Sequence, residues 1–146
     1  MKEIEEMILN ELYRYKNDID IIKTDKKIDC ITIFTKSSKE YDCMNKELCN
    51  NRIIDNMSSG NLYFLTKAIN TEYGELFFIK VRKQDNKFND YRISVDFIVD
   101  NYENFKGCIN NPVIKEYDTF ELIQFKNERN IINIVSIGVK EDYKIW

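Results

Sequence analysis

Hydrophobic residues in positions 3–17 recur at steps of three and four, which predicts an amphipathic α-helix. Ile4, Ile8, Leu12 and Tyr15 form its apolar stripe, and the opposite face carries charged and amide side chains. Glutamates in the first turn suit the positive end of the helix dipole. We therefore expect this helix to bury one face against the rest of the chain.

Residues 27–35 have apolar side chains on both faces of an extended chain, which is typical of a central strand covered on both sides. By strict alternation, positions 28, 30, 32 and 34 share one face. A second helix is predicted to begin at Ser37, because Ser37 and Glu40 have the spacing of a capping box. Its apolar stripe continues through Ile53 and Met57, and we expect it to end at Gly60.

Most of the remaining chain has the pattern of β-strands joined by short turns. Residues 61–70 and 75–83 flank a hairpin turn, and residues 91–99 alternate between apolar and polar side chains. Residues 119–126 and 130–139 form a second expected hairpin.

This order of elements, with strands following helices, predicts the α+β class. We expect a single α+β domain over residues 1–146, since the chain has the length of one ordinary domain. The expected sheet is largely antiparallel and curved, with about five to six strands. The two helices from the N-terminal half are expected to pack on one face of that sheet.

Charge and composition exclude several classes of protein. The net charge of −3 is small, and Lys and Arg are spread along the chain, so no segment forms a basic arm for nucleic acid. No apolar run is long enough to span a membrane, and the acidic N-terminus lacks the apolar segment of a signal peptide. We therefore expect a cytoplasmic protein with no membrane partner and with four free cysteines.

The chemistry available to the chain is narrow. It has no histidine, which excludes Ser-His-Asp and Cys-His nucleophile pairs. Its cysteines lack the close pairs of a structural zinc site, and its four glycines are too far apart for a phosphate-binding loop. We therefore predict no catalytic residues, no metal and no cofactor. Asp96 on a strand and Glu121 downstream leave a carboxylate-based, metal-dependent nuclease open as an alternative.

Two groups of side chains are candidates for binding. Aromatic and Arg side chains dominate the energy of protein interfaces, and four of them fall on turns and strand positions outside the predicted core. These partner-binding candidates are Tyr73, Arg82, Phe88 and Arg92. The strand before the polar loop also interleaves aromatic and basic residues, as surfaces that hold single-stranded nucleic acid do. The possible nucleic-acid contacts are Lys80, Lys83 and Lys87.

With no catalytic or cofactor motif, the chain is expected to act by binding. The leading hypothesis is a small stoichiometric inhibitor, of the anti-CRISPR, anti-defence or toxin-immunity type found in bacteria and phages, that blocks the functional surface of another protein. The alternative is a small protein that binds nucleic acid or a nucleotide, or a nuclease, through carboxylates and Lys or Arg side chains.

Overall fold

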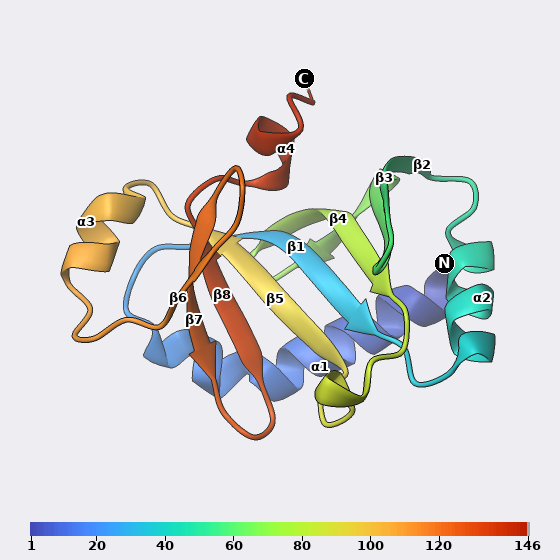
Figure 1. Ribbon diagram of the computed structural model, residues 1–146, viewed down its shortest axis with the longest axis horizontal. Helices are drawn as coiled ribbons and strands as arrows, with labels where there is room; N and C mark the ends of the chain where they lie inside the picture. Colours follow the sequence, from blue (N-terminus) through green and yellow to red (C-terminus); the bar gives the residue numbers. More distant parts are fainter. Residues whose placement is uncertain (146) are drawn as a thin grey trace.

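An eight-stranded mixed sheet forms the body of the structure, a computed structural model that describes residues 1–145 (Figure 1). Across the sheet the strands lie in the order β2-β3-β4-β1-β5-β8-β7-β6. Two neighbouring pairs, β1–β4 and β5–β8, are parallel, and the other pairs are antiparallel. The strands are β1 (Lys27–Phe34), β2 (Arg52–Met57), β3 (Gly60–Thr71), β4 (Gly74–Arg82), β5 (Ile93–Ile98), β6 (Ile114–Glu116), β7 (Glu121–Lys126) and β8 (Ile131–Val135).

The prediction of a largely antiparallel sheet with five to six strands and two helices was wrong. The sheet is mixed and has eight strands, and the described residues contain four α-helices. These helices are α1 (Lys2–Ile21), α2 (Ser38–Glu47), α3 (Tyr102–Gly107) and α4 (Val139–Asp142). Both parallel pairs join strands that are far apart in the sequence, and local patterns carry no information about such pairing.

The segment after α2 explains part of the difference in strand number. Ser37 caps α2 as predicted, and its side chain accepts a hydrogen bond from the backbone N–H of Glu40. The helix ends at Glu47 rather than near Gly60. Asn51 closes the turn that follows, because its side chain bonds the carbonyl of Leu48 at 3.2 Å. Residues 52–57 then form the edge strand β2 against β3.

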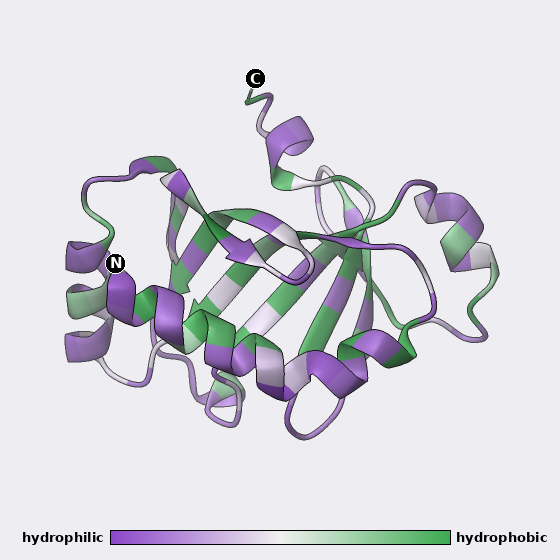
Figure 2. Ribbon diagram, turned by 180° about the vertical axis from the view of Figure 1, so that it is seen from behind, coloured by the Kyte–Doolittle hydropathy of each residue, from purple (hydrophilic) through white to green (hydrophobic). Residues whose placement is uncertain are grey.

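Helix α1 covers one face of the sheet along much of its width (Figure 2). The predicted stripe of Ile4, Ile8, Leu12 and Tyr15 is confirmed, since all four are buried, and the buried Ile19 extends it. They pack in one core with side chains from the central strands, and Met44 of α2 and Leu48, the residue that follows α2, join the same core. Full burial of such an aliphatic side chain contributes about 1.5–3 kcal/mol, so this layer supplies much of the folding free energy. Among residues 1–145, no helix combines the length and apolar character that crossing a membrane requires.

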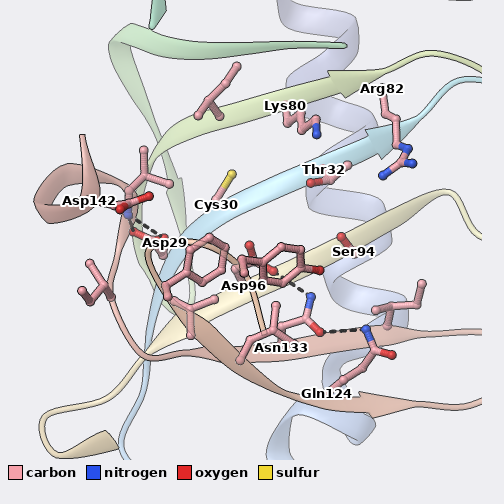
Figure 3. Close-up of a pocket in the computed structure, with 18 of the residues that line it drawn as sticks. Asp29, Cys30, Thr32, Lys80, Arg82, Ser94, Asp96, Gln124, Asn133 and Asp142 are labelled. Atoms are coloured by element: carbon pink, nitrogen blue, oxygen red, sulfur yellow. Dashed lines mark hydrogen bonds between the residues drawn. The ribbon is translucent and has the colours of Figure 1, made fainter. Parts of the chain in front are cut away.

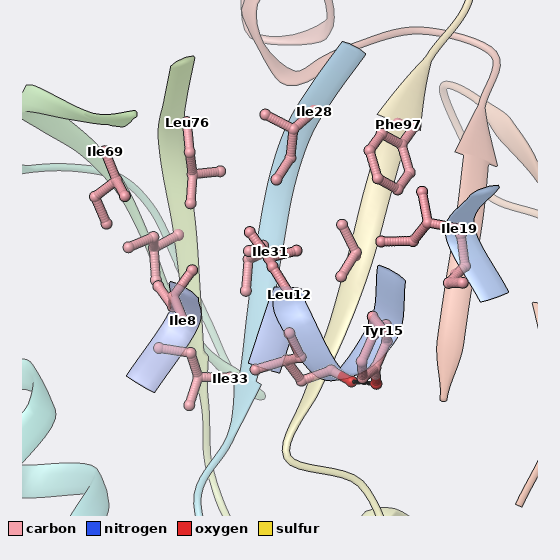
Figure 4. Close-up of a cluster of buried hydrophobic side chains, with 14 of the residues drawn as sticks. Ile8, Leu12, Tyr15, Ile19, Ile28, Ile31, Ile33, Ile69, Leu76 and Phe97 are labelled. Atoms are coloured by element: carbon pink, nitrogen blue, oxygen red, sulfur yellow. Dashed lines mark hydrogen bonds between the residues drawn. The ribbon is translucent and has the colours of Figure 1, made fainter. Parts of the chain in front are cut away.

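A bulge in β1 decides which of its side chains enter the core. The register with β5 shifts between Ile28 and Cys30, which places one extra residue, Asp29, in β1. Cys30 and Thr32 therefore lie on the face away from α1 (Figure 3). Ile28 joins the core under α1, on the face opposite to the one that strict alternation assigns to it (Figure 4).

Tyr15 joins α1 to two strands of the sheet by polar contacts inside the core. Its hydroxyl donates to the carbonyl of Ile93 at 2.6 Å and accepts from the backbone N–H of Ile131 at 3.3 Å. These groups begin β5 and β8, so one hydroxyl satisfies backbone atoms of two strands that would otherwise be buried without partners.

We predict that Tyr15→Phe lowers the free energy of unfolding by about 1–3 kcal/mol, because it leaves a buried carbonyl and a buried N–H unpaired. Tyr13→Phe is the matched control, since Tyr13 lies on the outer face of α1 and is 79% exposed. That control should change the free energy by less than about 0.5 kcal/mol. Urea unfolding of both variants measures this, and equal effects would contradict the assigned role of Tyr15.

Candidate functional site

The sheet face opposite α1 is hollowed into a pocket of about 320 Å³. Side chains of β1, β4, β5, β7 and β8 form its floor, and the segment containing α4 closes one end (Figure 3). Within the pocket, polar side chains occupy adjacent positions on neighbouring strands. One row is Lys80, Thr32 and Ser94, and the next is Cys30, Asp96 and Asn133.

Asp96 lies at the centre of the floor and is held by a chain of amides. The Asn133 amide donates to Asp96 Oδ1 at 2.9 Å, and the Gln124 amide donates to Asn133 Oδ1 at 3.2 Å. Burial raises the pKa of Asp96 to about 6, although the bond from Asn133 and the charge of Lys80 act in the opposite direction. No salt bridge reaches Asp96 from any residue of 1–145.

Asp29, the bulge residue, holds the C-terminal segment at one end of the pocket. Its two carboxylate oxygens accept the backbone N–H of Val139 at 3.2 and 3.1 Å. Burial, with the charge of Asp96 adding to it, raises the pKa of Asp29 to about 7. A Cβ at position 138 would lie 2.8 Å from Asp29 Oδ1, so a side chain there would require the Asp29 carboxylate to move.

Two cations lie toward the other end of the pocket. Lys80 Nζ donates to Ser59 Oγ at 2.9 Å, and burial together with the charge of Arg82 lowers the pKa of Lys80. The Arg82 guanidinium lies 4.6 Å from the ring centroid of Phe88 and 3.5 Å from Asp85. The pocket therefore contains acidic side chains near α4 and basic ones near the end of β4.

Aromatic rings form two stacked pairs along the walls. Phe34 and Phe88 stack with centroids 4.5 Å apart, and Tyr117 and Phe120 stack at 4.8 Å. All four rings line the pocket, and its floor carries the two polar rows among apolar side chains such as Leu122, Ile131 and Val135. This combination is typical of a ligand site, where a few polar groups fix orientation within an apolar cavity.

The structure brings together some of the predicted binding residues and separates others. Arg82, Phe88 and Lys80 line the pocket, and Lys87 Nζ lies 5.2 Å from the Phe88 ring. Lys83 lies outside it, with its Nζ 6.0 Å from the ring of Tyr41 in α2.

Arg92 and Tyr73 have structural contacts away from the pocket. Arg92 forms an ion pair with Glu40 at 2.6 Å and donates to the Phe34 carbonyl at 3.3 Å. Tyr73 packs edge-on against Phe97, on the α1 side, and its hydroxyl donates to Asp20 at 3.3 Å. The four predicted partner-binding residues therefore do not form one surface.

Asp96 and Glu121, the two carboxylates considered for a nuclease, have different contacts and do not share a site. Glu121 pairs with Lys106 at 2.9 Å and accepts from the Tyr102 hydroxyl at 2.8 Å, whereas Asp96 lies in the pocket floor. Among residues 1–145, no group of three or more His, Cys, Asp or Glu side chains could hold a metal ion.

Sequence reasoning missed Asp29, Asn133 and Gln124 as site residues. A single polar residue inside an apolar run was the available signal, since Asp29 follows Ile28 and Asn133 lies between two isoleucines. Such a residue in a central strand must either find a buried partner or face a cavity. The same test selects Asp96, which was considered only as a metal ligand.

Comparisons with known proteins define the fold and nothing more. No protein-family model and no curated protein sequence matches the chain. A solved structure described as "Structural Genomics, Protein EC4020" superposes with a TM-score of 0.66 and 7% sequence identity. The match covers 96% of this chain and 92% of that one. At such low identity the likeness concerns the arrangement of helices and strands alone.

We predict that Asp96→Asn stabilises the protein at pH 8 and has little effect at pH 4. The pKa of Asp96 is about 6 in the folded protein and 3.8 when it is unperturbed. The stabilisation that protonated Asp96 contributes is therefore complete below pH 3.8 and is lost as the pH rises through 6. Replacing the carboxylate with a neutral amide removes a cost of up to about 3 kcal/mol at pH 8 and less than about 1 kcal/mol at pH 4.

Denaturant unfolding at both pH values measures this difference. Asp42→Asn, a change at an exposed position on α2, is the matched control and should alter the stability little at either pH. Equal effects of Asp96→Asn at pH 4 and pH 8 would mean that the Asp96 carboxylate is fully compensated in the folded state.

Proposed function

We propose that this chain is a non-enzymatic binding protein that acts as a stoichiometric inhibitor and binds another protein with the hollow face of its sheet. The proposal covers two classes of inhibitor: inhibitors of defence enzymes such as CRISPR effectors, and immunity proteins that neutralise toxins. One observation carries the proposal: the face opposite α1 is an open pocket with a charged floor and aromatic walls.

The walls of the pocket support this proposal because they offer preorganised aromatic and Arg side chains. Tyr117 is 56% exposed and is already stacked on Phe120, and Arg82 is already placed over Phe88. Side chains that are ordered before binding lose little conformational entropy when a partner arrives. Tyr and Arg are also the types that contribute most at interfaces.

The nucleophiles in the pocket favour binding over turnover. Burial raises the pKa of the Cys30 thiol well above its ordinary value, so this sulfur stays protonated and unreactive at neutral pH. Thr32 and Ser94 have hydroxyl groups in the pocket, but the chain has no histidine to activate them, and Lys80 bonds Ser59 rather than either hydroxyl. All four cysteines are free, and the three others are exposed on the surface.

A single-stranded nucleic acid is the second candidate partner, because Lys87, Arg82 and Phe88 form one basic and aromatic cluster. Asp29, Asp96 and Asp142 line the same pocket and would repel phosphate groups. The protein-binding proposal therefore accounts for more of the lining. Binding to a nucleic acid would fall steeply as salt is added, which separates the two candidates.

We predict that Phe88→Ala and Tyr117→Ala each weaken the complex with the partner protein by about 2 kcal/mol, which is close to thirtyfold in Kd. The partner is first captured on the tagged chain from cells of the native host and purified. Titration calorimetry with each variant then gives the Kd.

Tyr13→Ala on the outer face of α1 is the matched control and should bind like the wild type, because that helix face lies on the other side of the sheet. A complex that is weakened by Tyr13→Ala and unaffected by both pocket variants would place the interface on the α1 side of the sheet and overturn the proposal.

A further inference from the structure

The floor of the pocket separates opposite charges along its length. Asp29 and Asp142 lie at the end nearest α4, and Arg82 lies at the end of β4 (Figure 3). Asp96 and Lys80 lie between these ends on the strands that flank β1. A ligand that carries both signs of charge would complement this floor.

Asp96 and Lys80 interact at a distance without forming an ion pair. Among residues 1–145, no salt bridge reaches either group. The described partners of Lys80 Nζ are neutral, Ser59 Oγ at 2.9 Å and Met57 Sδ at 3.7 Å. Two partly buried charges without a direct counter-ion are costly to the fold, and a ligand with complementary charges would offset that cost.

The neutral side chains of the floor can also bind a ligand that carries both charges. Thr32 lies beside Lys80 on one side and Ser94 on the other, and both hydroxyls can donate to an anion or accept from a cation. The amide chain from Gln124 through Asn133 fixes the direction of the Asp96 carboxylate. The site is therefore ordered before any ligand enters.

We propose that this pocket binds a small zwitterion of the α-amino-acid type, with its ammonium group toward Asp96 and its carboxylate toward Lys80. The side chain of the ligand lies along the stacked rings of Tyr117 and Phe120. A cavity of about 320 Å³ is at the small end of ligand pockets, which suits a molecule of this size. A simple amine would meet repulsion from Lys80, and a simple carboxylate would meet repulsion from Asp96.

The test compares matched probes on the wild-type protein at pH 7.5 by two-dimensional NMR of the backbone amides. L-Leucine and L-phenylalanine are the zwitterions, and each is paired with the amine that lacks its carboxylate and the acid that lacks its ammonium group. We expect saturable shifts at Thr32, Lys80 and Asp96 with at least one zwitterion. Its Kd should be at least tenfold lower than that of either matched probe.

The same titration with Asp96→Asn and with Lys80→Met should raise the Kd for that zwitterion at least tenfold, while Asp42→Asn leaves it unchanged. Equal affinity for a zwitterion and its matched amine or acid would overturn the proposal. So would the absence of shifts with both zwitterions, or shifts confined to residues outside the pocket. The comparison among probes needs no variant, so it holds even where a substitution prevents folding.

This inference goes beyond the proposed binding of a partner protein, and the two fail separately. The probe titration contains no partner protein, so a negative result there would not change what the calorimetry of the complex says about the inhibitor proposal. A partner whose binding ignores Phe88 and Tyr117, together with a positive titration, would overturn only the inhibitor proposal.

Discussion

The packing of α1 across one face of the sheet is the interaction on which the rest of the structure depends. The helix buries a continuous aliphatic and aromatic stripe from Ile4 to Ile19 over the central strands. Side chains alternate between the two faces of a strand, so this contact fixes which residues of the strands beneath α1 become core and which face the other way. The bulge at Asp29 is the one place where β1 departs from alternation. Because of it, Ile28 lies in the core under α1 and Cys30 lines the pocket.

Since one face of the sheet supplies the main core, the other face is free to carry groups that a core excludes. Asp96, Asp29 and Lys80 are charged or titratable groups placed on central strands, where apolar side chains would make the fold more stable. The Asn133 amide donates to Asp96 and the backbone N–H of Val139 donates to Asp29, yet burial still raises the pKa of both carboxyl groups. Residues that cost stability in this way concentrate at sites that bind something.

The parts of the fold that depend on local pattern could be predicted from the sequence. The stripe of α1 follows from helical spacing, and the cap at Ser37 follows from its distance to Glu40. The edge strand β2 was missed because Ile53 and Met57 also fit a helical stripe, and its pairing with β3 is a tertiary contact. The parallel pairs were missed for the same reason, since β1 lies beside β4 and β5 lies beside β8 only after the chain has folded. In the pocket, Arg82 and Phe88 were found from residue type. A polar residue at position 29 interrupts an apolar run, but that interruption does not reveal that β1 bulges there, because the bulge is defined only by the pairing of β1 with β5.

The hollow face holds Asp96, an acid without a direct counter-ion, at the middle of its floor. Carbon-13 NMR of the aspartate carboxyl groups tests this directly, because it gives the pKa of Asp96 in the folded protein without reference to stability or to any ligand. The resonance is assigned by its loss in Asp96→Asn. We expect a titration midpoint of about 6. A midpoint near the ordinary value of 3.8 would show that water or Lys80 fully stabilises the carboxylate, and it would contradict the claim.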